Sequence, residues 1–399
     1  MKITILGDMM CEPPVLKAAK QKGGNYDFSP VFAKVKPMLD EADYVISNLE
    51  FPMAGEEAGY TDRYYVFNAP DSFAKAVKDA GVDMVSTVNN HSFDRGLSGM
   101  VRTIKVLDEL GIPHTGTFLP DTEREEACYF ETNGVTIGVV AYTYTTNSSL
   151  YGDEKKYRAC VNYLRPYEMR TYLPEVGAKL TTWVDRRFPK LKEEHRAIIK
   201  MCVGIPNTIE RADDFIDEEA VKPYIEQFVK DIQTAKEKAD IVIAYPHVGG
   251  QFNIQPGRFS EYVADAAIKA GADAVMASHS HMVQPAMWKE GIPCAYSLGN
   301  FNMDPISTIV VKKNLPGLGL AFHLYLEDKK IETATFSIIK TEKKWGEQMV
   351  PCPVDVLFPT LKSQKAKKQL EQEVRQVYRW VTGGELGEDW LKKEYELKK

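Results

Sequence analysis

Cysteine is scarce in this chain, and long apolar runs are absent. The six cysteines among 399 residues are widely spaced and form no C-x-x-C pair, which argues against a disulfide framework and against a zinc ribbon. No window approaches the roughly 18 uncharged apolar residues that a membrane-spanning helix requires. A formal net charge of −6, without a basic stripe on any predicted helix, argues against nucleic acid as a partner.

The first residues predict where the protein resides. The sequence begins MKITILGDMM, an apolar run of only about four residues, whereas the apolar core of a signal peptide has about 7–15. An acid follows this run instead of a small-residue cleavage site. We therefore expect a cytoplasmic protein with reduced thiols and no membrane anchor in this chain.

One pattern recurs along the chain: an amphipathic helix, a Gly/Ala-Asp step, a short β-branched run and a cluster of polar residues. It occurs in segments 29–50, 71–91, 226–250 and 261–281. Helix–strand units of this kind predict a layered α/β (α+β) fold. In such folds ligands bind beyond the carboxyl ends of the strands, so the polar residues at these ends are candidates for one shared site.

Two regions depart from this pattern. Residues from about 151 to 235 are charged and aromatic-rich, and we interpret them as a helical insertion. From about residue 308, two strand-like runs predict a hairpin that turns at 328–330, and an amphipathic helix follows over 362–380. We therefore divide the chain into a main domain, 1–307, and a C-terminal hairpin and helical extension, 308–399, packed on it.

Three of the seven histidines fall at predicted strand ends within 247–281. His279 and His281 stand at positions i and i+2 of a predicted strand, so their side chains should point the same way. Such a pair suits Zn, Mn, Fe or Ni. Each histidine alone, His247 included, would also fit a structural or surface-turn position. Their shared placement favours a common metal site.

Carboxylates and an amide complete the candidate ligand set. Asp8 follows the first predicted strand, where it would also fit a turn or a helix cap. Glu50 follows a buried strand, and a buried Glu needs a partner, which a metal would supply. In VNNHSFDRG, Asn90 offers a neutral oxygen, and Asp94 can orient His91 and raise its pKa for proton transfer. The alternative is an Asn-rich turn with an Asp helix cap.

Nitrogen and oxygen ligands without thiolate are typical of a hydrolytic centre with one or two divalent ions, here Mn, Zn or Fe. The predicted metal ligands are Asp8, Glu50, Asn90, His247, His279 and His281, and the predicted acid catalyst is His91 with Asp94. The residues predicted to bind a small-molecule or polyanionic substrate are Asn48, Asn89, Gln251, Arg258, Tyr296 and Asn300. A surface position for Arg258 and a structural role for Tyr296 stay open.

The ordered motifs resemble a known family. Gly7-Asp8, NLE, NNHSFDRG, PHVGGQF, SHSHMVQP and YSLGNF are similar to motifs of the CapA family, the poly-γ-glutamate capsule biosynthesis proteins, which are related to calcineurin-like metallophosphoesterases. The resemblance runs from Met1 to about Asp304, interrupted by 151–235. It implies a metallophosphatase-type β-sandwich flanked by helices.

The resemblance also implies a role for each ligand. Glu50 would take the place of the metal-bridging carboxylate, and His91 that of the general acid steadied by Asp94. One metal would be bound by Asn90, His247 and His279, and the other by Asp8 and His281.

This chain departs from the family pattern in three places. The usual D-x-H is Asp8-Met9-Met10, so one metal loses an imidazole, and a single-metal site stays open. The bridging residue is Glu instead of Asp. After His247, HVGGQ replaces the common HWG-x-E, and Gln251 can hydrogen-bond a substrate but cannot act as a carboxylate.

Three functions follow from these residues and the resemblance. We favour a metal-dependent hydrolase in which metal-bound hydroxide attacks a phosphoester and His91 protonates the leaving group. The alternatives are a γ-glutamyl amide hydrolase or other component of poly-γ-glutamate capsule biosynthesis, and a non-catalytic binding protein. The metal's identity, the substrate and the oligomeric state are left open.

Overall fold

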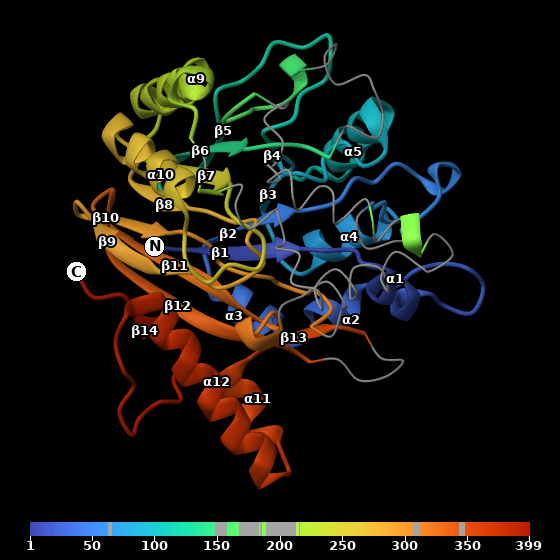
Figure 1. Ribbon diagram of the computed structural model, residues 1–399, viewed down its shortest axis with the longest axis vertical. Helices are drawn as coiled ribbons and strands as arrows, with labels where there is room; N and C mark the ends of the chain where they lie inside the picture. Colours follow the sequence, from blue (N-terminus) through green and yellow to red (C-terminus); the bar gives the residue numbers. More distant parts are fainter. Residues whose placement is uncertain are drawn as a thin grey trace.

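Two mixed β-sheets pack face to face in the computed structural model, and helices cover their outer faces (Figure 1). The structure describes residues 1–62, 66–147, 158–166, 183, 186–188, 213–214, 216–305, 312–342 and 348–399. The layered α/β fold expected from the helix–strand units is thus confirmed.

The larger sheet has eight strands in the order β13-β12-β11-β1-β2-β3-β4, with β14 beside β12. Neighbours from β1 to β4 run parallel, and the other pairs are antiparallel. The strands are β1 (Lys2–Met9), β2 (Tyr44–Leu49), β3 (Met84–Ser86), β4 (His114–Thr115), β11 (Leu318–Glu327), β12 (Lys330–Glu342), β13 (Val350–Pro353) and β14 (Tyr395–Glu396). The helices that contribute to the core on its outer face are α1 (Pro13–Ala19), α2 (Ser29–Phe32), α3 (Lys36–Leu39), α4 (Ser72–Asp79) and α5 (Gly96–Leu110).

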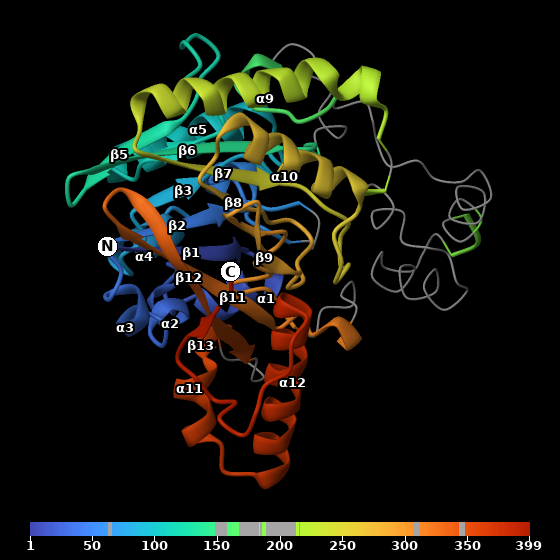
Figure 2. The ribbon, with the colours of Figure 1, turned by 90° about the vertical axis from the view of Figure 1, so that its left-hand side faces the viewer.

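The smaller sheet has six strands in the order β5-β6-β7-β8-β10-β9. Its strands are β5 (Cys128–Thr132), β6 (Val135–Thr143), β7 (Ile241–His247), β8 (Ala274–Met276), β9 (Ala286–Lys289) and β10 (Ile292–Ala295). The steps from β6 to β7, β8 and β10 are all parallel. Helices α9 (Glu218–Lys238) and α10 (Arg258–Ala270) lie across its outer face (Figure 2). The remaining described helices are α11 (Val354–Leu357), α12 (Gln364–Thr382) and the 3₁₀ turns Glu56–Ala58, Arg158–Cys160, Lys312–Asn314 and Phe358–Thr360.

Side-chain alternation along the strands builds the core. In β6, Ile137 and Val139 face the larger sheet, whereas Val140 packs against the outer helices. In β1, Ile3 and Ile5 face the smaller sheet, and Leu6 belongs to the opposite cluster. Strands β1 and β6 are thus apolar on both faces and lie in layers that are covered on both sides, as expected for parallel strands in a layered fold.

Two features of the predicted organisation look different in three dimensions. The predicted insertion, about 151–235, falls mostly outside the described residues, but its last part from Glu218 is the start of α9, which connects β6 to β7 and packs on both. The predicted C-terminal hairpin is formed by β11 and β12. β11 pairs with β1, so the hairpin completes the main sheet and is not an appendage packed on it.

A close approach of two backbone segments positions Asp8 and Asn300. A Cβ at Gly7 would lie 2.1 Å from the carbonyl oxygen of Gly299, so only glycine permits residues 298–300 to run this close alongside the end of β1. The amide of Asp8 then donates to the carbonyl of Gly299 at 3.0 Å, and the amide of Phe301 donates to the carbonyl of Asp8 at 2.8 Å. This pairing places Asn300 next to Asp8.

Among the described helices, none has the length and apolar character of a membrane span.

Candidate metal centre

The carboxyl ends of parallel strands from both sheets converge at one place. In the larger sheet, β1 carries Asp8 near its end and β2 is followed by Glu50, while in the smaller sheet β7 ends at His247. The loops after β3 and β8 supply the other candidate ligands, Asn90, His279 and His281. All six side chains are buried, Glu50 completely.

Glu50 lies at the centre of this group. One of its oxygens, Oε1, is 3.5 Å from His281 Nε2 and 3.6 Å from His247 Nε2. His91 Nε2 is 4.0 Å from the same oxygen. Yet neither oxygen of Glu50 has a hydrogen-bond partner among the described residues. A fully buried carboxylate without a partner is costly, so this position calls for a cation or a proton.

The second carboxylate, Asp8, is held by neighbours on both sheets. Its Oδ1 accepts a hydrogen bond from Asn48 Nδ2 at 2.7 Å, and its Oδ2 accepts one from the backbone amide of His279 at 3.1 Å. His281 Nδ1 lies 3.6 Å from Oδ2. These contacts fix Asp8 beside Glu50, and the proximity of Asp8, after burial itself, raises the pKa of the Glu50 carboxyl well above its ordinary value.

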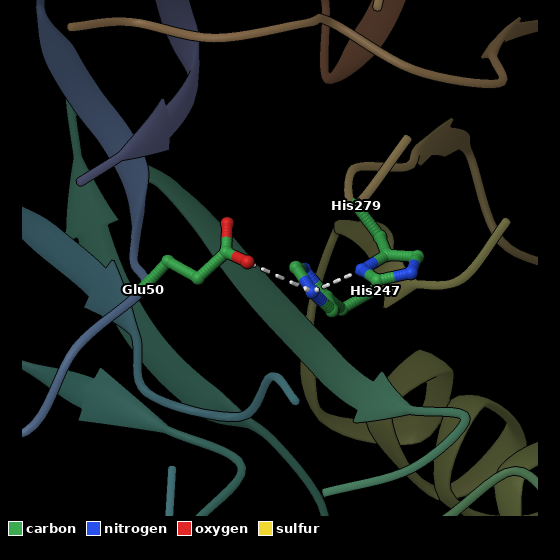
Figure 3. A group of neighbouring side chains, drawn as sticks. All are labelled: Glu50, His247 and His279. Carbon is green, nitrogen blue, oxygen red and sulfur yellow. Dashed lines mark hydrogen bonds and ion pairs between the residues drawn. The ribbon is translucent and has the colours of Figure 1, made fainter. Parts of the chain in front are cut away.

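Two histidines of the cluster, His247 and His279, meet at one amide oxygen. Asn90 Oδ1 lies 2.8 Å from His247 Nε2 and 3.2 Å from His279 Nδ1. These two ring nitrogens are 3.1 Å apart, and Figure 3 shows both imidazoles beside Glu50. Burial, followed by the neighbouring imidazoles, lowers the pKa of His247 and His279 well below the ordinary value. Burial also lowers the pKa of His281. Neutral imidazoles do not neutralise the two carboxylates, and they are the form that binds metals.

His279 and His281 both face the carboxylates, as predicted. The predicted reason, side-chain alternation along a strand, is wrong. Strand β8 ends at Met276, before either histidine. Both residues have positive φ, 106° for His279 and 56° for His281, a backbone conformation that side chains other than glycine rarely adopt. A strained loop aims them, and such strain is found mainly at functional sites.

His91 and Asp94 form a separate pair at the edge of the cluster. His91 Nδ1 lies 2.6 Å from Asp94 Oδ2, which also accepts a hydrogen bond from the amide of Phe67 at 2.7 Å. The ring of Phe67 packs against the imidazole, with centroids 4.3 Å apart. With Nδ1 held by Asp94, Nε2 is the nitrogen that faces Glu50, which suits an imidazole that carries a proton to a bound substrate.

The donor atoms divide into two groups that could each hold an ion. Glu50, His247 and His279 form one, and Asp8, Glu50 and His281 form the other, with the ligand atoms of each group within 4.8 Å of one another. Glu50 is shared, as the bridging assignment requires. The first group has Asn90 Oδ1 as an additional oxygen, whereas the second has no imidazole from position 10, where Met10 is buried in an apolar cluster. The nitrogen and oxygen donors fit Mn, Zn or Fe.

Three of the residues predicted to bind substrate make contacts within the protein instead. Asn48 bridges Asp8 and Asn89, whose Nδ2 donates to Asn48 Oδ1 at 3.1 Å and to the carbonyl of Leu49 at 2.9 Å. Asn300 Oδ1 accepts from His281 Nδ1 at 2.9 Å, and its Nδ2 donates to the carbonyls of His281 and Pro316. These amides orient the cluster, and their contact with substrate stays a prediction.

The other predicted substrate residues lie apart from these donors. Tyr296 belongs to the apolar layer between the smaller sheet and its helices, and its hydroxyl accepts from Lys289 Nζ at 3.2 Å. Arg258 is the first residue of α10, and Gln251 is half-buried in the loop after β7. None of the described contacts connects Arg258 or Gln251 to the metal-ligand candidates.

Two residues that contact the candidate metal ligands were not predicted from the sequence. Tyr144 Oη lies 2.9 Å from His279 Nε2, and Ser278 Oγ lies 2.9 Å from His247 Nδ1. Tyr144 directly follows β6, so the rule that polar residues at strand ends line the site would have found it. Ser278 stands next to His279 in SHSH, but nothing in the sequence tells that it contacts a histidine 31 residues away.

Comparison with known proteins gives a family match. A model of the bacterial capsule synthesis protein family PGA_cap matches residues 2–305. The capsule biosynthesis protein CapA of Bacillus anthracis is 26% identical over 306 residues, which cover 76% of this chain and 59% of that protein. The PGA biosynthesis protein CapA of Bacillus subtilis (strain 168) is 25% identical over 304 residues, 75% of this chain and 63% of that protein. The chain thus spans about three-fifths of the length of these relatives.

A solved structure was also found to be similar. The crystal structure of a hypothetical protein from Thermus thermophilus is 15% identical, with a TM-score of 0.42, and the match covers 85% of this chain and 99% of that one. A likeness of this degree carries no information about the site.

Proposed function

Since this chain belongs to the PGA_cap family of bacterial capsule synthesis proteins, we propose that it serves capsule polymer metabolism as a metal-dependent hydrolase of a phosphoester. The observation that carries the proposal is Glu50. Its carboxylate is completely buried, has no hydrogen-bond partner among the described residues, and stands between imidazole nitrogens and a second carboxylate. A divalent cation satisfies this arrangement better than any group of the protein does.

The residues of the centre have distinct tasks in the proposed reaction. The six ligands would hold one or two divalent ions, which would supply Lewis acidity towards a phosphoryl oxygen and activate water. Glu50 belongs to both donor groups and so sets their separation. Asn48 holds Asp8, and Asn300 accepts the Nδ1 proton of His281, which leaves Nε2 of that ring with its lone pair facing Glu50.

His91 handles the proton of the leaving group. Asp94 Oδ2 accepts the proton on His91 Nδ1 and stabilises the imidazolium, whose second proton is then on Nε2. Since Nε2 faces the centre, that proton is available to a leaving oxygen bound beside Glu50. Asp94 Oδ2 also accepts a hydrogen bond from the Phe67 amide, which holds the carboxylate in place.

A second candidate is hydrolysis of a γ-glutamyl amide, since the Bacillus subtilis relative is named a PGA biosynthesis protein and the sequence motifs resemble poly-γ-glutamate capsule proteins. The same residues would then act on a carbonyl carbon. The third candidate function is binding without catalysis, as a component of the protein complex that makes the polymer.

A substrate panel on reconstituted protein tests the proposal. We expect hydrolysis of phosphodiesters or phosphomonoesters that requires added Mn²⁺, Zn²⁺ or Fe²⁺ and stops with chelator. Release of glutamate from γ-glutamyl peptides, without phosphoester turnover, would shift the assignment to the amide hydrolase. Tight metal binding without turnover of either class would contradict a hydrolase and favour the binding role.

A further inference from the structure

We infer that Tyr144 is a positioning residue: its hydroxyl holds His279 with Nδ1, and not Nε2, turned towards the cation. This inference rests on the proposed metal centre and concerns one ligand of it. Tyr144 Oη is 2.9 Å from His279 Nε2, and the two rings pack with centroids 4.7 Å apart. The opposite nitrogen, Nδ1, is the one near Asn90 Oδ1 and His247 Nε2.

The other two histidines show the reverse arrangement. In His247 and His281 the nitrogen that has a side-chain hydrogen-bond partner is Nδ1, which contacts Ser278 Oγ at 2.9 Å and Asn300 Oδ1 at 2.9 Å, respectively. His281 Nδ1 also lies 3.6 Å from Asp8 Oδ2. The inward nitrogen of both histidines is Nε2, at 3.6 Å and 3.5 Å from Glu50 Oε1. Of these three histidines, His279 is therefore the one that presents Nδ1, and its outer nitrogen contacts the Tyr144 hydroxyl.

A tyrosine hydroxyl suits this position because it can both donate and accept. Without a cation, His279 can donate from Nδ1 to Asn90 Oδ1 while Nε2 accepts from the Tyr144 hydroxyl. With a cation on Nδ1, the ring proton must be on Nε2, and the same hydroxyl then accepts it. The proton has only moved between the ring nitrogens, so the imidazole stays neutral in both states.

Tyr144 itself is firmly held. Its backbone amide donates to the carbonyl of His247 at 3.1 Å, and its own carbonyl accepts from Arg165 Nε at 3.0 Å. The guanidinium of Arg165 lies over the phenol ring, 4.5 Å from its centroid. The ring is thus fixed between Arg165 and His279, so its hydroxyl can determine how the imidazole is turned.

The test compares Tyr144→Phe with wild type by calorimetric titration with Zn²⁺ and Mn²⁺, and reads the His279 tautomer from ¹⁵N NMR of the Zn²⁺-loaded protein. We expect the variant to bind about 10–100-fold more weakly, as outer partners of metal-binding histidines commonly contribute. In wild type the His279 signal should show the proton on Nε2. Tyr296→Phe removes a buried, hydrogen-bonded tyrosine hydroxyl elsewhere in the fold and should leave the affinity unchanged.

The possible outcomes separate this inference from the function. Equal affinities of wild type and Tyr144→Phe, or a proton on His279 Nδ1 in the loaded protein, would overturn the role of Tyr144 while the metal centre stands. Wild type that binds neither ion would remove the metal centre and the inference together. Urea unfolding in chelator shows whether Tyr144→Phe is folded. Tyr144→His restores a hydrogen-bond donor and acceptor in this position, so it should recover part of the affinity if the loss in Tyr144→Phe is specific.

Discussion

Replacing Glu50 with glutamine is expected to stabilise the metal-free protein and to abolish its response to divalent cations. The carboxylate is completely buried without a hydrogen-bond partner in the described structure, and Asp8 lies beside it. Because its pKa is raised, the buried carboxyl must take up a proton in the metal-free protein, a cost that glutamine does not have. The free energy of unfolding in chelator should therefore rise by about 1–3 kcal/mol. Because Glu50 belongs to both donor groups, its loss should weaken cation binding by more than about 100-fold. This exceeds the loss in affinity that commonly follows when a residue that only hydrogen-bonds a metal ligand is replaced.

Glu394→Gln is a matched control that is expected to lower the free energy of unfolding instead of raising it. This carboxylate accepts hydrogen bonds from Lys2, Thr335 and Tyr325. Burial raises its pKa, but His323 and these partners outweigh burial and lower the pKa from 4.5 to about 2. Its stabilisation is therefore fully present above pH 4.5 and is lost as the pH falls towards 2. The control should lose about 1–2 kcal/mol at neutral pH and keep its cation response.

Urea unfolding of both variants, in chelator and with excess Mn²⁺ or Zn²⁺, provides the measurement. An ion present at about 100 times its dissociation constant adds about 2.7 kcal/mol to wild type. If Glu50→Gln destabilised the metal-free protein as Glu394→Gln does, Glu50 would have a partner that the geometry does not show. If it kept the cation response, Glu50 would not be a ligand.

Removing the imidazole of His91 is expected to slow phosphoester hydrolysis by about 10²–10⁴-fold when the leaving group is a poor one. An alkoxide must be protonated as it departs, whereas p-nitrophenolate departs without help. The loss in His91→Ala should therefore be much smaller for a p-nitrophenyl ester than for an alkyl ester of the same phosphate. Cation affinity should change little, because His91 belongs to neither of the two donor groups.

The measurement is kcat on the two esters together with metal content. His114→Ala is the control, because this histidine contacts Asp108 at the end of α5 and lies outside the cluster. An equal loss on both esters that accompanies loss of metal would show that His91 is a ligand and not the acid. The Asp94→Asn variant should reproduce the leaving-group dependence, since Asp94 acts only through His91.

The sequence was informative where topology decides the outcome. Polar residues that end parallel strands of one sheet must meet at one edge, and this argument selected Asp8 and Glu50 at the ends of β1 and β2. His247 ends β7 of the smaller sheet, and the packing of the two sheets brings it to the same place. It failed at Tyr296, because β10 ends at Ala295 and the following side chain turns to the outer, apolar face. A shift of one residue along a strand reverses the face, and turn signals do not locate strand ends that closely.

Other features depended on contacts that local patterns do not contain. The positive φ angles of His279 and His281 arise in a loop with partners far away in the chain. The His279 amide donates to Asp8, and the carbonyls of Ser278 and Ser280 accept from the amides of Val248 and Phe252, which follow β7. The pairing of β11 with β1 joins residues more than 300 positions apart, so the hairpin looked like an extension. Whether an asparagine binds substrate or orients a neighbour, as Asn300 does for His281, depends on packing around it.

Crystals of the protein soaked with Zn²⁺ or Mn²⁺, with anomalous diffraction recorded at the absorption edge of each metal, test the metal centre most directly. We predict an anomalous peak bounded by Glu50, His247 and His279, and a second, weaker one bounded by Asp8, Glu50 and His281. A peak at the first position alone would still agree with a single-ion centre. No peak within coordination distance of Glu50, in crystals that show the ions elsewhere or not at all, would contradict the account.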